Sequence, residues 1–175
     1  KSIQQTSDEG YMVSAVIQND FGYDSICLIK TNENGTQQWI QTFNFGTSSE
    51  KMHHIQEIVG GGYVLCGTTY HSNKEIRLIK TDEQGNMIWN KTYSGPNNLT
   101  AAGKSVQQTT DGGYIIIGSC KLSSGDDGDI YLMKTDNLGA QQWSKTFGDS
   151  FDDVGRCVKQ TADGGYIITG YIEIL

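Results

Sequence analysis

The sequence predicts an all-β fold built from repeated four-stranded antiparallel units. Its clearest signal is a Gly-Tyr pair that recurs with tyrosines at positions 11, 63, 114 and 166, which are 52, 51 and 52 residues apart. A fixed period near fifty residues indicates stacked copies of one supersecondary unit. Runs of β-branched and aromatic residues, such as 114–117 (Tyr-Ile-Ile-Ile), favour strands that are buried on both faces. The 22 glycines agree with a turn-rich β protein.

The first two strands of each unit are predicted to form a hairpin. First strands are expected at residues 2–6, 54–58, 105–109 and 156–161, and second strands at 10–17, 62–68, 113–119 and 165–171. Asp8, Asp111 and Asp163 precede the glycines of the connecting turns. Glycine suits such a tight turn because it adopts positive φ without steric cost.

The third and fourth strands are marked by a spacing that does not vary. Third strands are expected at residues 25–31, 76–81 and 129–135, and fourth strands at 37–43, 86–93 and 140–147. A lysine near the end of each third strand is followed by a glycine after five residues and by a tryptophan after nine: Lys30, Gly35 and Trp39; Lys80, Gly85 and Trp89; Lys134, Gly139 and Trp143. This pattern predicts a type I turn that ends in a left-handed glycine.

The segments between these strands are predicted to be surface loops, because their lengths vary while the strand spacing does not. They are 18–24, 69–75 and 120–128 within the units, and 44–53, 94–104 and 148–155 between them. No linker divides the chain, so residues 1–175 are interpreted as one domain. The repeat units are about 2–43, 54–93 and 105–147, followed by a half-unit at 156–175.

A single four-stranded meander cannot bury both of its faces, but copies stacked face to face around an axis can. The chain is therefore predicted to form about three and a half blades of a β-propeller. The repeated aromatic residues are interpreted as packing between blades, with ligand stacking as the alternative for the tryptophans: Trp39, Trp89 and Trp143, with Tyr11, Tyr63, Tyr114 and Tyr166.

One extended motif points to a family. It reads Gly-Gly-Tyr-Ile-x-x-Gly, then Asp-x-Tyr-Leu-x-Lys-Thr-Asp-x-x-Gly-x-x-x-Trp-x-Lys-Thr-Phe-Gly, and the third unit carries it most completely. This motif resembles the β-propeller repeats of bacterial and archaeal surface and secreted proteins. It is more loosely similar to kelch repeats and to the blades of quinoprotein dehydrogenases. The resemblance covers essentially the whole chain and implies a secreted or cell-surface propeller, but no particular activity, because propellers host many.

The predicted number of strands leaves a propeller incomplete. Fourteen strands make three and a half blades, whereas closed propellers typically have 4–8. We consider three possibilities: the chain is part of a longer polypeptide, two copies associate, or copies stack head to tail into a filament. The chain begins at Lys1, not at methionine, which favours a processed protein or a piece of a longer one.

Two acidic loops are the candidate binding sites. Asp126, Asp127 and Asp129 surround Gly128, and such oxygen ligands can wrap Ca²⁺. The loop lacks the distal glutamate and the spacing of an EF-hand, so a solvated turn is the favoured interpretation and a Ca²⁺ site is the alternative. A second cluster follows in the loop after the third unit, at Asp149, Asp152 and Asp153. Both clusters could accept basic groups of a partner.

Other polar and sulfur-containing residues are interpreted more plainly. His53 and His54 are neighbours on a strand, where side chains alternate between faces, so they are not expected to share a metal. The repeated lysines are interpreted as solvated strand ends, with a ring that binds an anion as the alternative. The four cysteines are interpreted as small core residues, and a single disulfide between two of them is the alternative: Cys27, Cys66, Cys120 and Cys157.

These observations favour a non-enzymatic binding or assembly scaffold. The net charge of -7 argues against nucleic acid as a partner, and no apolar run approaches the roughly 20 residues of a membrane helix. No catalytic motif is recognised, so a propeller enzyme is the alternative without residue support. The expected partners are a protein, a glycan or further copies of the chain, and no cofactor is expected beyond the Ca²⁺ considered above. Asn98 begins an Asn-Leu-Thr glycosylation sequon.

Overall fold

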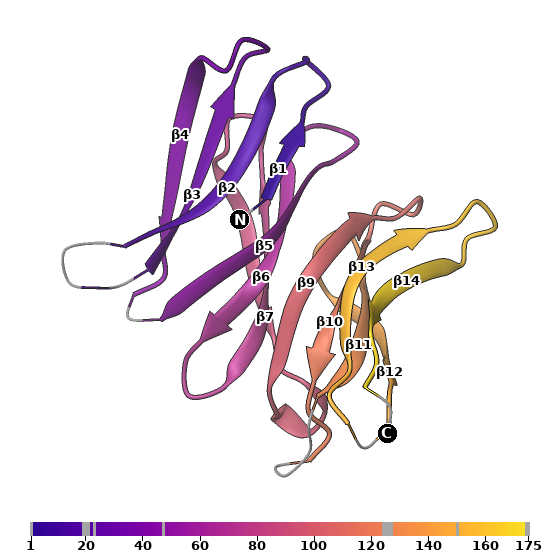
Figure 1. The fold of residues 1–175 in the computed structure, drawn as a ribbon. Helices are drawn as coiled ribbons and strands as arrows, with labels where there is room; N and C mark the ends of the chain where they lie inside the picture. Colours follow the sequence, from indigo (N-terminus) through magenta and orange to yellow (C-terminus); the bar gives the residue numbers. More distant parts are fainter. Residues whose placement is uncertain are drawn as a thin grey trace.

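The computed structural model describes residues 2–18, 22, 24–46, 48–123, 128–149 and 151–173. Within these residues the chain forms β-strands and one short 3-10 turn, η1 (Pro96–Asn98). The strands make three four-stranded sheets and one two-stranded sheet, all antiparallel. Each sheet is a meander in which strands adjacent in sequence are paired (Figure 1). The prediction of an all-β fold of four-stranded antiparallel units is confirmed.

The strands follow one another in chain order within each sheet. The first sheet contains β1 (Ser2–Gln5), β2 (Tyr11–Gln18), β3 (Asp24–Thr31) and β4 (Gln37–Asn44). The second contains β5 (Ser49–Glu57), β6 (Tyr63–Tyr70), β7 (Lys74–Thr81) and β8 (Met87–Tyr93). The third contains β9 (Ala101–Gln108), β10 (Tyr114–Cys120), β11 (Asp129–Thr135) and β12 (Gln141–Phe147), and the last contains β13 (Val154–Gln160) and β14 (Tyr166–Tyr171).

Three first strands begin earlier than the sequence predicts. β5 begins at Ser49, β9 at Ala101 and β13 at Val154, so the prediction that the last residues of 44–53, 94–104 and 148–155 are loop is wrong. The physical reason is a bulge in each strand, which interrupts the alternation of side chains on which the prediction relied. The predicted loop 69–75 is also largely strand, because β6 and β7 are joined by a tight hairpin.

Glycines on the second strands make room for these bulges. A Cβ atom on Gly118 would lie 1.8 Å from the carbonyl oxygen of Ala102, and one on Gly67 would lie 2.2 Å from that of Lys51. Gly170 repeats the arrangement, 2.4 Å from the carbonyl oxygen of Val154. The first strand can therefore approach the second closely only where the second strand has no side chain.

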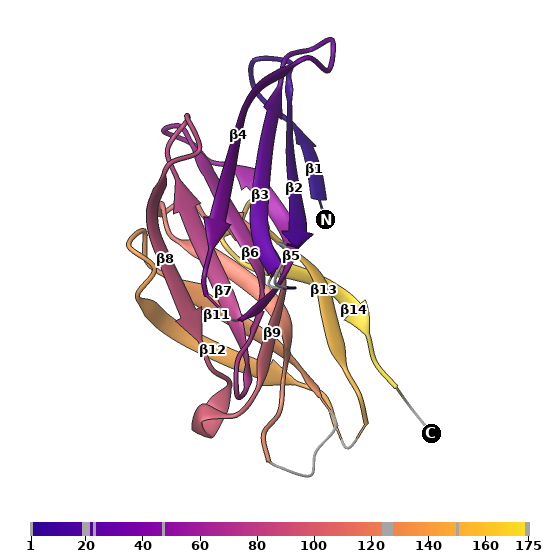
Figure 2. The same cartoon turned by 90° about the vertical axis from the view of Figure 1, so that its left-hand side faces the viewer.

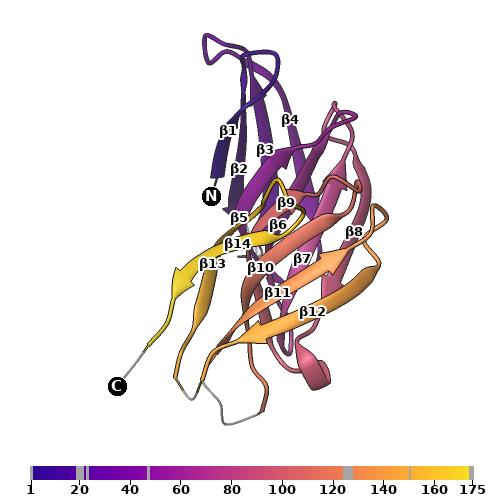
Figure 3. The same cartoon turned by 90° about the vertical axis from the view of Figure 1, so that its right-hand side faces the viewer.

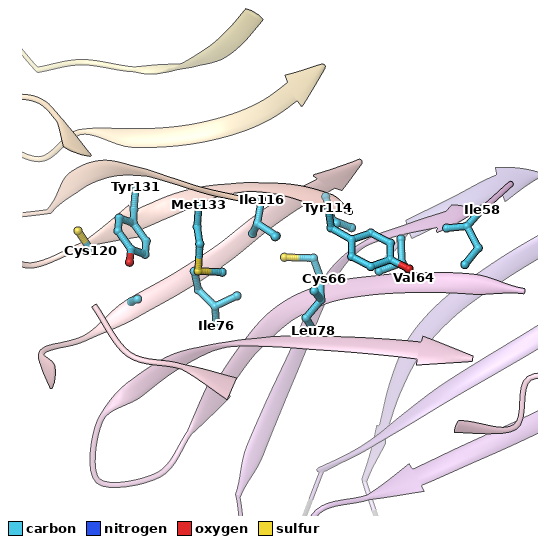
Figure 4. Close-up of a cluster of buried hydrophobic side chains, with 12 residues drawn as sticks. Ile58, Val64, Cys66, Ile76, Leu78, Tyr114, Ile116, Cys120, Tyr131 and Met133 are labelled. Atoms are coloured by element: carbon cyan, nitrogen blue, oxygen red, sulfur yellow. The ribbon is translucent and has the colours of Figure 1, made fainter. Parts of the chain in front are cut away.

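Hydrophobic cores lie between successive sheets. Residues of the second and third sheets, among them Val64, Leu78, Ile116 and Met133, form the core drawn in Figure 4. A second core joins the first and second sheets, and a third joins the third sheet to the two-stranded one. In each core a tryptophan of one sheet packs edge-on or tilted against a tyrosine of the next: Trp39 on Tyr63, Trp89 on Tyr114 and Trp143 on Tyr166, with ring centroids 5.8–6.2 Å apart.

The four first strands lie next to one another along the stack, in the order β1, β5, β9, β13 (Figure 1). The first sheet forms one end of the stack, facing the viewer in Figure 2, and the two-stranded sheet forms the other, facing the viewer in Figure 3. Each sheet repeats its packing on the next, so the molecule is a series of equivalent interfaces.

Both ends of the stack expose apolar surface. Ile167 on β14 is 59% exposed, whereas Ile115, at the same repeat position of the third sheet, is fully buried. At the other end Ile3 is 66% exposed, and Tyr11 is half-buried where Tyr114 is fully buried. These faces lack the neighbouring sheet that covers their equivalents. No helix among the described residues has the length and hydropathy needed to cross a membrane.

Candidate binding site on the first strands

Repeated hydrogen bonds join each first strand to the next. A glutamine side-chain oxygen on one strand accepts a bond from a backbone N–H of the following first strand: Gln4 from Glu57 (2.8 Å), Gln56 from Gln108 (2.7 Å) and Gln107 from Gln160 (2.6 Å). Bonds in the return direction run from the backbone N–H groups of Ser7, Val59 and Thr110 to the side chains of Glu57, Gln108 and Gln160. These bonds hold the four strands in one array.

The array forms a groove. A cavity of about 210 Å³ is lined by residues of all four first strands, including Gln4, His54, Ser105 and Cys157. Cys157 is exposed, whereas the other three cysteines are buried, and none of the four forms a disulfide. The interpretation of the cysteines as core residues therefore holds for three of them and is wrong for Cys157. Lys159 occupies in the last strand the position that glutamine holds in the other three.

The bulges beside this groove carry basic residues. The bulged residue has no partner on the second strand, and it is His53 in β5, Lys104 in β9 and Arg156 in β13. The Nζ atom of Lys104 lies 3.4 Å from Nε2 of His53, so side chains of two sheets meet here. The equivalent residue of the first unit is Lys1, which lies outside the described residues.

Sequence reasoning missed these residues because it placed the starts of two first strands at His54 and Ser105, just after them. A usable signal was present. The residue ten positions before each repeated tyrosine is basic in all four units: Lys1, His53, Lys104 and Arg156. The alternation used to separate His53 from His54 is also interrupted by the bulge. The two rings nevertheless have different partners, because Nδ1 of His54 accepts a bond from the N–H of Val106.

The bulged residues His53, Lys104 and Arg156 are called the basic cluster below. Burial and neighbouring positive charges lower the pKa values of His53 and Lys104. Burial, followed by the charge of Lys104, lowers the pKa of His53 to about 4. Burial and then the charge of Arg156 lower the pKa of Lys104. In the described part of the chain the ion pairs are Lys30–Asp8, Arg77–Glu50 and Lys134–Asp111, and none includes a member of the cluster.

The acidic residues Glu50 and Glu57 on β5 have partners outside the basic cluster. Glu50 on β5 is buried, with Oε2 3.0 Å from Nε of Arg77. Glu57 at the end of β5 accepts bonds from the N–H and the hydroxyl of Ser7. The first strands thus present positive charge on a chain whose net charge is -7.

The described residues of the two predicted acidic sites lie close together at one end of the third and last sheets. Asp126 and Asp127 are outside the described residues. Asp152 accepts a bond from the N–H of Gly128, which ties the two predicted clusters to each other. The side chains of Asp129 and Asp153 also converge, because both would touch a Cβ atom on Gly148. No group of three or more His, Cys, Asp or Glu residues among the described positions could hold a metal ion, so the Ca²⁺ site stays a prediction.

The remaining residues of the second cluster differ in exposure. Asp153 is fully buried, and its carboxylate accepts bonds from the N–H groups of Asp149 and Glu173, both at 3.1 Å. It therefore holds its own loop in place. Asp149 and Asp152 are exposed and remain accessible to a partner. Asn98 of the predicted sequon is exposed within η1.

The interpretation of the repeated lysines as solvated strand ends is wrong for two of them. Lys30 and Lys134 are buried, at 4% and 3% exposure. The Nζ atom of Lys134 donates to both carboxylate oxygens of Asp111, at 3.1 and 2.9 Å, and to Gln142 and the carbonyl of Thr135. Lys30 repeats these bonds with Asp8, Gln38 and Thr31. In the second sheet Gly60 and Ile88 stand where the carboxylate and the glutamine would be.

This pairing predicts a pH-dependent stability. Hydrogen bonds from Thr109 and then Lys134 lower the pKa of Asp111 from 3.8 to about 2, so the carboxylate stabilises the fold above about pH 4, and this contribution is lost as the pH falls towards 2. We expect Asp111→Asn to cost about 1–2 kcal/mol near pH 7, a value reduced for the exposure of the carboxylate. Urea unfolding of both proteins between pH 2 and 7 measures this difference. Lys80→Gln is the control, and a difference that does not shrink at low pH contradicts the prediction.

Comparisons of the chain with models of known protein families and with curated proteins gave no match. The functional interpretation therefore depends on the repeats and on the contacts described above.

Proposed function

We propose that this chain is part of a β-propeller and works as a non-enzymatic binding or assembly scaffold. The observation that carries the proposal is the repetition of one interface: the same tryptophan–tyrosine contact and the same glutamine-to-backbone bonds join each sheet to the next. Each sheet is therefore related to the next by about the same rotation and translation. Repeating this operation with further sheets would arrange them around an axis, with the first strands nearest to it, as in propellers.

The groove on the first strands is the part of this scaffold that best suits a ligand. It combines residues from four sheets, which are held in register by bonds between the strands. Rigid sites of this kind lose little conformational entropy on binding. We infer a protein or glycan ligand and a secreted or cell-surface location, in keeping with the resemblance to surface and secreted propeller repeats.

Self-assembly is a second candidate function, favoured by the two uncovered end faces. Ile167 is 59% exposed at a position that is fully buried in the third sheet. Large apolar faces of this kind mark interaction sites. Further copies of the chain, or further repeats in the same polypeptide, would cover them.

Two measurements test these proposals. Light scattering of the purified chain gives its mass in solution, and a multiple of 19.2 kDa supports assembly, whereas a clean monomer excludes it. Electron microscopy or crystallography then shows how the sheets are arranged. Sheets that radiate from an axis support the propeller, and a two-layer sandwich would contradict it. Screening against an array of glycans tests the binding role directly.

A further inference from the structure

We propose that His53, Lys104 and Arg156 form a site on the first strands that binds an oxyanion group of the ligand: a carboxylate, sulfate or phosphate. The site rests on the proposed function and deepens it, because it places a ligand chemistry beside the groove, which is lined by the next residue of each strand: His54, Ser105 and Cys157. It consists of the bulged residues of three first strands, β5, β9 and β13. Bulges commonly re-aim side chains at binding sites.

The fold brings nitrogen-bearing side chains of different sheets together. Lys104 on β9 reaches His53 on β5, with 3.4 Å between their nitrogen atoms. Arg156 occupies the equivalent bulge of β13, the first strand that packs directly against β9. Three elements far apart in the sequence thus deliver a nitrogen donor to one region. Arginine and lysine are the side chains that best bind carboxylate, sulfate and phosphate oxygens.

The cluster lacks an internal counter-charge among the described residues. None of its members takes part in an ion pair there. The neighbouring acids are committed to other partners, Glu50 to Arg77 and Glu57 to Ser7. Lys104 is half-buried, and burial and the positive charge of Arg156 both disfavour its charged form. A bound anion would offset this cost, which makes the cluster suited to an anion.

Repetition separates this cluster from a chance gathering of charges. Lysine, arginine and histidine together make up 16 of the 175 residues, yet all four units have one at this position. The neighbouring positions do not share the feature: the following residues are Ser2, His54, Ser105 and Cys157. A basic residue is therefore a property of the bulge position in the repeat.

The proposed site also predicts coupling to protons. His53 is neutral near pH 7, because burial and the cations Lys104, Lys51 and Arg156 lower its pKa to about 4. An anion bound beside the ring raises that pKa, so binding takes up protons and strengthens as the pH falls through the raised pKa towards 4, with sulfate as the probe because its own charge does not change in this range. Two further titratable groups act on Lys104: Lys74, whose positive charge lowers the pKa of Lys104, and Cys66 on β6, which stays a neutral thiol because burial raises its pKa to about 12.

Titration calorimetry of the purified chain at low ionic strength tests the site. The probes are inorganic phosphate, inorganic sulfate and citrate, with chloride as the reference anion. We expect saturable binding of at least one probe, weakened about tenfold or more in the double variant Lys104→Gln/Arg156→Gln. The control is Lys91→Gln/Lys145→Gln, which removes the same charge from exposed positions on β8 and β12 and should change the affinity less than about twofold.

Alkylation of Cys157 provides a second readout, because this exposed thiol directly follows Arg156 and lines the groove. The bound probe should slow its reaction with iodoacetamide in the parent protein and not in the Lys104→Gln/Arg156→Gln variant. Equal melting temperatures of the two double variants show that both are folded.

Absence of saturable binding by all three probes overturns the inference, as does an equal loss of affinity in both double variants. A preference for phosphate indicates a phosphorylated ligand. A preference for sulfate or citrate indicates an acidic glycan or another carboxylate ligand. If the chain forms a propeller but binds no anion, only this inference is refuted. If the sheets form a two-layer sandwich, the proposed function is refuted instead.

Discussion

Glu50→Ala is expected to lower the free energy of unfolding by about 3–5 kcal/mol, because it leaves a buried guanidinium without its counter-ion. Glu50 and Arg77 are 1% and 5% exposed. The carboxylate accepts a bond from Nε of Arg77 at 3.0 Å and others from the hydroxyl groups of Ser48 and Thr69. The guanidinium also lies over the ring of Phe45, at 4.0 Å. Denaturation by urea measures the loss.

Two further variants make the Glu50 prediction specific. The double variant Glu50→Met/Arg77→Met should lose less stability than Glu50→Ala alone, because it leaves no unpaired charge in the core. Glu33→Ala removes an exposed glutamate from a turn and should change stability by less than about 0.5 kcal/mol. A loss for Glu50→Ala as small as that for Glu33→Ala would refute the prediction.

Tyr114→Ala is expected to cost about 3–5 kcal/mol, because it removes a large ring from the core between the second and third sheets. Tyr114 is fully buried and packs at 71° to the ring of Trp89, with 5.8 Å between centroids. Its hydroxyl group is buried without a hydrogen-bond partner. Tyr114→Phe should therefore be neutral or slightly stabilising. Thermal and urea unfolding of both variants measure the difference.

Tyr11→Ala is the matched control, because Tyr11 occupies the same repeat position on the uncovered face of the first sheet. It is half-buried and is expected to lose no more than about 1 kcal/mol in the isolated chain. If assembly covers this face, Tyr11→Ala should also lower the mass seen by light scattering. Equal losses at Tyr11 and Tyr114 would contradict the view that sheets protect each other's faces.

The repeat unit and its strands were predictable because the signals are local. The spacing of Gly-Tyr pairs, the alternation of turns with apolar runs, and the invariant step from Lys134 to Gly139 and Trp143 all lie within one unit. Backbone conformation follows closely from such short-range patterns: Gly35, Gly85 and Gly139 all have φ near 79°. Packing of the repeated aromatic residues between sheets was also predictable from the repeat, since a single sheet cannot bury both faces, but the pairing of each tryptophan with a tyrosine was seen only in the structure.

Features that depend on charge and burial were not predictable from single units. Lys134 is buried beside Asp111, a pairing over 23 residues that the lysine's own flanking sequence does not indicate. Asp153 belongs to an acidic loop but is buried under backbone N–H groups. A bulge in β9 hid the start of that strand and, with it, the role of Lys104.

The sequence by itself determined that the chain is a series of four-stranded antiparallel sheets, because the apolar runs that form strands and the glycines that form turns occur within each unit of about fifty residues. Only the tertiary structure decided which polar residues meet. His53, Lys104 and Arg156 belong to three different units, and they form a cluster because the first strands lie side by side and bulge at the same point. Contacts between units depend on how sheets stack, and stacking is set by the packing of whole faces.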